Sequence, residues 1–114
     1  MSMDIIISNE ETWMSPTPEY LVIADAIKEH LNNNDPLDRE ISIMLEEATV
    51  FLDLSELPVE LFCHFCKIYK EAFEKYPDSD AGIYVKNNGD FPYVMSILEA
   101  FLKRLEADPR YGDS

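Results

Sequence analysis

The residues with the clearest capacity for chemistry are Cys63, His64 and Cys66, which lie close together in the chain. A Cys-x-x-Cys pair supplies two thiolate ligands to many zinc sites, and a histidine can supply a third. The surrounding sequence predicts a helix, on which Cys63 and Cys66 lie about 60° apart while His64 points about 100° or more away from each. The other histidine, His30, lies on a different predicted helix. We therefore expect no metal site here, and no disulfide, because two cysteines on one regular helical turn rarely reach disulfide geometry.

Other kinds of catalytic site find no support in the sequence. The chain contains only three glycines, and none of them forms a Gly-rich loop of the type that binds phosphate groups. No serine or cysteine occupies a recognisable nucleophile motif. Neighbouring carboxylates arise by chance in so acidic a chain, so they do not by themselves indicate acid–base catalysis. We therefore expect a protein that is not an enzyme and that uses no cofactor.

The charge of the chain is strongly and unevenly negative. There are 23 acidic residues against 9 Lys and Arg residues, which gives a formal net charge of −14. Through residue 66 there are 14 acids and 2 bases (net −12), whereas the remainder has 9 acids and 7 bases (net −2). Such a field repels nucleic acids and anionic lipids and speeds encounter with basic proteins. We expect a basic protein partner, no direct contact with nucleic acid and no membrane association.

The clearest helical period lies between Pro36 and Asp53. Asp35 occupies the N-cap position and Pro36 the first helical position, where its missing N–H costs nothing. At about 100° per residue, the apolar residues of this stretch fall within an arc of roughly 120°, which is the width of a core-facing stripe. This predicted stripe consists of Leu37, Ile41, Met44, Leu45, Ala48, Phe51 and Leu52.

The opposite side of this predicted helix mixes acids with apolar residues that lie off the stripe. Ile43 and Val50 lie there among Glu46, Glu47 and Asp53. One interpretation is a binding surface for a cationic partner. The alternative is that the N-terminal segment covers the two apolar side chains and that the acids are only a solvated face.

Three further helices and a few shorter elements are expected around this stretch. The helices run from Thr17 to about Leu31, from Pro58 to about Tyr76, and from Phe91, capped by Asp90, to about residue 107. A capping box formed by Ser8 and Glu11 predicts a short helical turn that carries Trp13 and Met14. The sequence Gly82-Ile83-Tyr84-Val85 favours an extended segment before a turn at Asn88-Gly89, and residues 81–86 could pair with residues 4–7 as one short ribbon.

These elements predict an all-α fold, an antiparallel four-helix bundle with a short N-terminal extension and a loose C-terminal tail. We expect a single helical domain over residues 1–107 and a flexible tail over residues 108–114. No apolar run is long enough to span a bilayer, and the N-terminus lacks the basic region of a secretory signal. A cytoplasmic protein with reduced cysteines is the simplest expectation.

The last third of the chain contains an ordered series of short motifs. A helix ending in an aromatic residue is followed by Pro77-Asp78-Ser79-Asp80, then Tyr84, then Asn88-Gly89, and finally Ser96-Ile97-Leu98-Glu99 within the last helix. In order and spacing this series resembles the C-terminal third of the colicin D immunity protein family, although the spacing from the tyrosine to Asn-Gly is one residue shorter here. The resemblance covers about 30 of the 114 residues.

The resemblance implies a small acidic helical protein that neutralises a tRNA-cleaving toxin by occupying its basic active-site cleft. Asp78 and Asp80 match by type the positions at which the family places carboxylates, and Glu74 lies nearby in a different register. Two further acidic positions of the family are occupied here by Phe73 and Tyr76. The plain alternative is that Asp78 and Asp80 belong to a polar loop after a helix.

We therefore expect an immunity protein that binds and occludes a cognate bacterial nuclease toxin, colicin-like or contact-delivered. Two other classes stay open: an acidic nucleic-acid mimic that inhibits a DNA-binding or restriction-type protein, and a generic helical adaptor. A nuclease encoded beside this gene would distinguish the first class from the others. The expected partner-binding residues are Asp78, Asp80, Glu74, Tyr84, Glu46, Glu47, Val50 and Asp53.

Overall fold

The computed structural model describes residues 2–8, 11–32, 34–48 and 51–111, which form helices and a small sheet. Its elements, in chain order, are β1 (Ser2–Ser8), β2 (Glu11–Pro16), α1 (Thr17–Lys28), α2 (Pro36–Glu47), β3 (Phe51–Asp53), α3 (Val59–Lys75), the 3-10 turn η1 (Tyr76–Asp78), α4 (Asp80–Asn88) and α5 (Phe91–Glu106).

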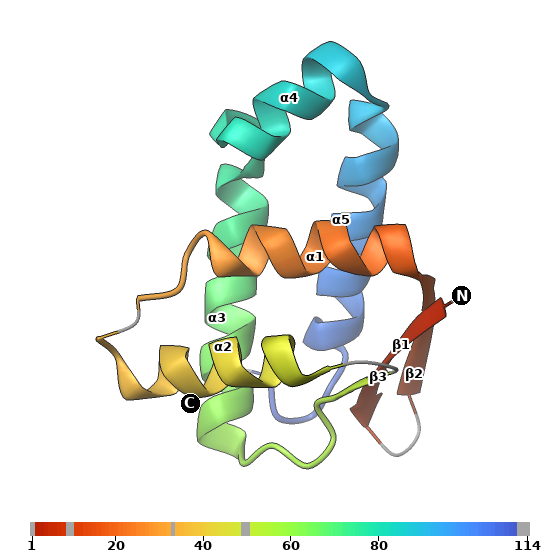
Figure 1. Ribbon diagram of the computed structural model, residues 1–114. Coiled ribbons are helices and arrows are strands. Elements are labelled where there is room, and N and C mark those ends of the chain that lie inside the picture. The colour runs from red at the N-terminus through yellow and green to blue at the C-terminus, as the bar shows by residue number, and fades with distance from the viewer. Residues whose placement is uncertain (1, 9–10, 33, 49–50, 112–114) are drawn as a thin grey trace.

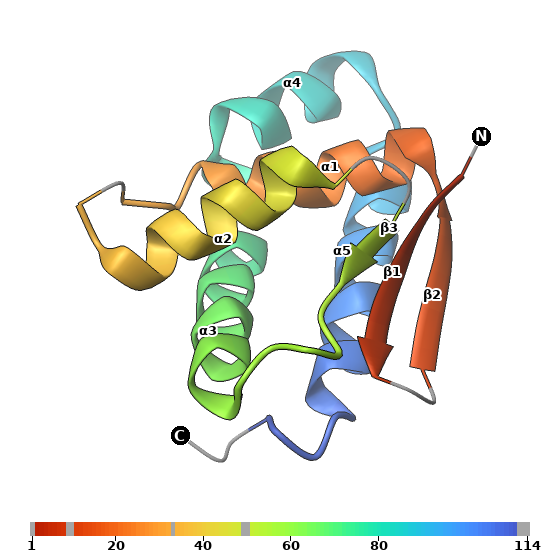
Figure 2. The same cartoon turned by 60° about the horizontal axis from the view of Figure 1, so that its bottom comes forward.

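Two long antiparallel helices, α3 and α5, form the centre of the molecule (Figure 1). The short helix α4 joins their ends, and α1 crosses both of them and contacts each. Helix α2 packs against α3, and the sheet lies beside the start of α1 (Figure 2). The predominance of helix that the sequence predicts is confirmed. The antiparallel four-helix bundle is not, because α1 crosses the central pair instead of running along it.

The all-α class must be corrected because the described residues include a three-stranded sheet with the order β2-β1-β3. Strand β1 pairs antiparallel with β2 and parallel with β3, with Ile5 opposite Leu52. This sheet exceeds the single short ribbon that the sequence suggested. The helical turn expected at Trp13 and Met14 is wrong, because these residues lie in β2. The ribbon between residues 4–7 and 81–86 does not form, since residues 81–86 are helical.

Aromatic side chains join the two central helices. The Tyr69 and Phe101 rings meet edge to face with their centroids 5.0 Å apart, and the Phe65 ring lies 6.5 Å from the same Phe101 ring. The Tyr69 hydroxyl donates to the Leu98 carbonyl oxygen over 2.7 Å, which gives this buried polar group a partner. Burial also raises the pKa of Tyr69. These helices carry the apolar spacing that the sequence predicts, and their stripes meet as expected.

Helix α2 ends earlier than its apolar period suggests. Asp35 caps its start as predicted, accepting from the backbone N–H groups of Leu37 and Asp38. The helix stops at Glu47, and Ala48 already has extended backbone angles. The residues that follow are rich in β-branched and aromatic side chains, which favour strands, and β1 offers them a pairing partner. The predicted continuous helix to Asp53 is therefore wrong, and Phe51–Asp53 form β3.

The segment expected to be extended at Gly82-Ile83-Tyr84-Val85 is instead helix α4. Ser79 caps this helix by accepting from the Gly82 N–H at 3.0 Å. Gly82 is required there, since a Cβ atom would lie 1.9 Å from the Tyr76 carbonyl oxygen. The Asn88-Gly89 pair, predicted as a turn, ends the helix, with the Gly89 N–H donating to the Val85 carbonyl oxygen.

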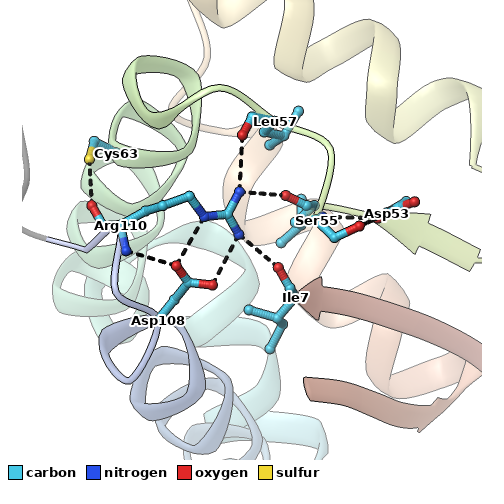
Figure 3. Close-up of polar contacts among 8 residues, drawn as sticks. Ile7, Asp53, Ser55, Leu57, Cys63, Asp108 and Arg110 are labelled. Atoms are coloured by element: carbon cyan, nitrogen blue, oxygen red, sulfur yellow. Dashed lines mark hydrogen bonds and ion pairs between the residues drawn. The ribbon is translucent and has the colours of Figure 1, made fainter. Parts of the chain in front are cut away.

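The chain after α5, which we expected to be loose from residue 108 onward, is held to the body of the protein through residue 111. All five guanidinium N–H groups of Arg110 make hydrogen bonds. They donate to both carboxylate oxygens of Asp108 and to the carbonyl oxygens of Ile7, Leu54 and Leu57, as Figure 3 shows for the labelled residues. We call this set the Arg110 clamp.

The Arg110 clamp is also packed against an aromatic ring and a thiol. The guanidinium carbon lies 3.8 Å from the centre of the Phe62 ring, a cation–π contact that favours a partly desolvated cation. The Cys63 thiol donates to the Arg110 carbonyl oxygen at 3.0 Å. Because the acceptors belong to β1, to the connector between β3 and α3, and to the C-terminal turn, one side chain joins three separate segments. Among the described residues, no helix has the length and apolar character needed to cross a membrane.

Replacement of Arg110 is predicted to destabilise the fold strongly. Arg110→Ala removes the cationic partner of the buried Asp108 carboxylate, which keeps only a hydrogen bond from the backbone N–H of residue 110, and such a loss typically costs about 3–5 kcal/mol of unfolding free energy. Arg110→Lys should recover only part of this, because an ammonium group cannot reproduce the fixed fork of five donors. Chemical denaturation measures the effect, with Lys70→Ala, an exposed position with the same change in charge, as the control. Equal stabilities for Arg110→Ala and Lys70→Ala would contradict the clamp.

The clamp also predicts a specific acid dependence of stability. The hydrogen bonds from Arg110 lower the pKa of Asp108 below its ordinary value. A carboxyl group whose pKa is lower in the folded state stabilises the fold above its unfolded pKa of about 4, and this contribution is lost as pH falls through the folded pKa. The stability difference between the parent and Asp108→Asn should therefore be largest above about pH 4 and shrink at lower pH. The exposed control Glu56→Gln should show no such convergence.

Candidate functional site

A shallow groove lies between α2 and β3, and we call it the α2–β3 groove. Its volume is about 370 Å³. Where the chain is described, the lining combines apolar side chains with acids and includes no basic residue. The residues that line the groove are Glu40, Ile43, Met44, Glu47, Ala48, Leu52 and Asp53.

The carboxylates of the groove come from two different elements. Glu40 and Glu47 are exposed on the same side of α2, seven residues apart and hence two helical turns from each other. Asp53 ends β3. Among the described parts of the chain, no Lys, Arg or His side chain forms an ion pair with any of these three acids. The groove therefore presents negative charge that the side chains of the described residues do not neutralise.

The position of Asp53 is set by its neighbours in the connector. Its Oδ1 atom accepts from the Ser55 backbone N–H at 2.9 Å and from the Ser55 hydroxyl at 2.5 Å. The Leu54 N–H donates to the Ile6 carbonyl oxygen at 2.7 Å, which continues the pairing of β1 with β3. The Leu54 carbonyl oxygen accepts from Arg110. Asp53 is thus held between the sheet and the Arg110 clamp.

The other wall of the groove, α2, is attached to α3 through a buried carboxylate. Asp38 Oδ1 lies 2.5 Å from His64 Nε2, and Asp38 Oδ2 accepts from the Asn32 N–H at 2.7 Å. Burial opposes the ionisation of Asp38, but these hydrogen bonds outweigh it and lower its pKa below the ordinary value. His64 points away from the two cysteines, as the sequence predicts. It faces α2, where it contacts Asp38.

The same region contains the set of side chains best placed for a cation. Ligand atoms of Asp35, Asp38 and His64 lie within 4.8 Å of one another. Both carboxylates, however, already accept hydrogen bonds, Asp35 as a helix cap and Asp38 from His64 and Asn32. Asp35 therefore acts as a cap of α2, and the contact between Asp38 and His64 connects α2 to α3. Cys66 is buried, which raises the pKa of its thiol to about 12 and disfavours the thiolate that metal binding requires.

The second candidate surface lies at η1 and α4, and we call it the η1–α4 surface. Asp78, Asp80 and the nearby Glu74 are exposed, and Tyr84 is 67% exposed to solvent. The cap formed by Ser79 fixes the backbone between the two aspartates. This surface is not purely acidic, since Lys86 Nζ donates to the Pro77 carbonyl oxygen at 2.8 Å, next to Asp78 in the chain.

The predicted site residues divide between these two surfaces. Glu47 and Asp53 lie in the α2–β3 groove, Glu46 is exposed on α2 outside it, and Val50 lies outside the described residues. Helix α4 lies at the far end of the central pair, with α1 between it and α2 (Figure 1), so the two surfaces are separate.

Five residues that line the α2–β3 groove were not among the predicted partner-binding residues: Glu40, Ile43, Met44, Ala48 and Leu52. The sequence could have indicated Glu40 and Ile43, because their spacing from Glu47 places all three side chains on one face of the helix. Met44 was assigned to the core stripe; it is only partly buried and also lines the groove.

Comparisons with known proteins give one informative similarity. No protein-family model matches the chain, and no curated protein matches it by sequence. The fold does match one chain of a solved structure described as "CdiA-CT toxin from Burkholderia pseudomallei E479 in complex with cognate CdiI immunity protein". The TM-score is 0.71 at 18% sequence identity, and the match covers 96% of this chain and 98% of that chain. The two chains therefore share a fold over nearly their whole length, whereas the colicin D-like subtype is not confirmed.

Proposed function

We propose that this protein is an immunity protein that binds a bacterial toxin domain and blocks its activity. The observation that carries the proposal is the end-to-end fold similarity to one chain of a toxin–immunity complex. The description of that complex contains two kinds of chain, and the charge of this one favours the immunity role. Its net charge of −14 suits capture of a cationic domain and opposes contact with nucleic acid.

The physical mechanism is occlusion assisted by electrostatic attraction. An immunity protein must bind its toxin before the toxin reaches its substrate, so fast association is valuable. Complementary charge raises association rates well above those of neutral protein pairs, and the effect weakens as salt screens the field. The unpaired acids of the α2–β3 groove and the exposed acids of the η1–α4 surface both supply such a field.

The finer part of the proposal is that the toxin is a nuclease that cleaves tRNA. It is supported by the motif series that resembles the colicin D immunity family, in which carboxylates occupy the positions of substrate phosphates. In this chain Asp78 and Asp80 are exposed on either side of the Ser79 cap, and they are therefore available to a partner. A nuclease active site that binds phosphates is cationic, which fits an acidic blocker.

The proposal predicts protection of cells from one specific toxin. Affinity capture from the native host, with mass spectrometry of the bound protein, should identify a toxin domain with an excess of Lys and Arg. Expression of that domain in a test bacterium should stop growth, and co-expression of this protein should restore it, while Arg110→Ala, as a folding-deficient control, should restore it less. Capture of a DNA-binding or restriction-type protein would contradict the proposal and support the nucleic-acid-mimic alternative.

Paired variants distinguish the two surfaces. If the η1–α4 surface forms the interface centre, Asp78→Ala with Asp80→Ala should speed dissociation, since loss of a buried, hydrogen-bonded carboxylate costs about 2–5 kcal/mol. Glu46→Ala with Glu47→Ala should then mainly slow association at low salt. If α2 forms the centre, the pattern reverses, and Ile43→Asp, at an exposed apolar position of α2, becomes the most damaging single change. Surface plasmon resonance with the captured toxin domain measures both rates, and parent-like binding by all these folded variants would exclude both surfaces.

A further inference from the structure

We propose that the α2–β3 groove binds an arginine side chain of a protein partner. The inference deepens the proposed function, on which it rests for the identity of that partner as a toxin domain. The chemistry of the groove, by contrast, is argued from its own residues.

The floor of the groove suits the apolar part of a long side chain. Ile43 is 50% exposed, although it lies beside partly buried Met44 and Ala48 and buried Leu52. An arginine side chain can lay its methylene groups along such a surface while its charged end remains at the rim. Contact there would remove the apolar surface of Ile43 from water, which is favourable.

The rim suits the charged end of the same side chain. Glu40 and Glu47 lie on one wall, two helical turns apart, and Asp53 lies on the other. One oxygen of Asp53 accepts from Ser55, so this carboxylate is fixed before any partner arrives. A guanidinium group placed between the walls can donate to carboxylates on both sides because its five N–H groups point in different directions.

The combination favours arginine over other cations. A guanidinium is planar and weakly hydrated, so it loses less than an ammonium group when it is partly covered by apolar side chains. Magnesium and calcium ions prefer several converging oxygen ligands, whereas half of this groove is apolar. Arg110 shows the same chemistry inside this protein: its guanidinium lies over the Phe62 ring while its N–H groups bind Asp108.

The test uses the full chain, labelled with ¹⁵N, and a capped peptide of sequence Gly-Gly-Arg-Gly-Gly at millimolar concentration. Amide shifts in ¹H–¹⁵N spectra should concentrate on residues 40–48 and 52–55, and the lysine analogue should bind at least threefold more weakly. The variant Glu40→Gln with Glu47→Gln should reduce the affinity for the arginine peptide about fivefold or more. The matched control, Asp78→Asn with Asp80→Asn, removes the same charge from the η1–α4 surface and should leave the affinity unchanged.

Several results would overturn the inference. They are shifts spread evenly over all acidic faces, shifts centred on α4, equal binding of the lysine analogue, or equal losses in both paired variants. Equivalent shifts with Mg²⁺ would identify a metal-binding groove instead, and shifts that grow with protein concentration in the absence of peptide would identify a contact between copies. Toxin protection without arginine binding would refute the groove assignment alone. Arginine binding in a protein that protects against no toxin would refute the proposed function alone.

Discussion

The guanidinium group of Arg110 is the interaction on which the arrangement of the other segments most depends. It brings the turn that follows α5 to the end of the first strand, although Arg110 and Ile7 are 103 positions apart in the sequence. The carbonyl oxygens that it binds at Leu54 and Leu57 belong to a connector that is neither helix nor strand. Buried carbonyl groups without hydrogen-bond partners are costly. The Arg110 guanidinium provides partners for three of them, at Ile7, Leu54 and Leu57, and so stabilises a connector that has no regular hydrogen bonding of its own.

The geometry of the α2–β3 groove depends on this arrangement. One wall, α2, is attached to α3 by the contact between buried Asp38 and partly buried His64. The other wall, β3, is held by pairing with β1 and by the hydrogen bond from Arg110 to the adjacent Leu54. Two independent attachments therefore keep Glu40, Glu47 and Asp53 around one groove despite their mutual repulsion. A surface that holds like charges in place before binding is costly for folding and favourable for rapid capture of a cation.

The sequence predicted the elements whose stabilising contacts are local or repeat at a regular spacing. Asp35 and Asp90 cap helices as expected, and the stripes of α3 and α5 meet in the core. The errors occur where a distant partner decides the structure. Strand β3 has only three residues and exists because β1 lies beside it, so helical spacing in the sequence concealed it.

The candidate site was predictable in part for the same reason. Glu47 and Asp53 were grouped as one face of a continuous helix, and they do line one groove, although from two elements. The residues of α4 have strand-like propensity at Ile83, Tyr84 and Val85, but the Ser79 cap and the close approach at Gly82 favour a helix. The role of Arg110 could not be predicted from the sequence. A lone arginine near a Pro and a Gly is typical of a tail, and its acceptors include backbone atoms far away in the chain.

The central claim is that an acidic surface of this protein covers a toxin domain, and hydrogen–deuterium exchange of the captured complex tests it most directly. The account predicts that amides of residues 40–48 and of the connector after β3 exchange more slowly in the complex than in the free protein. Protection confined to the exposed face of α5, with α2, β3 and α4 exchanging as in the free protein, would contradict it.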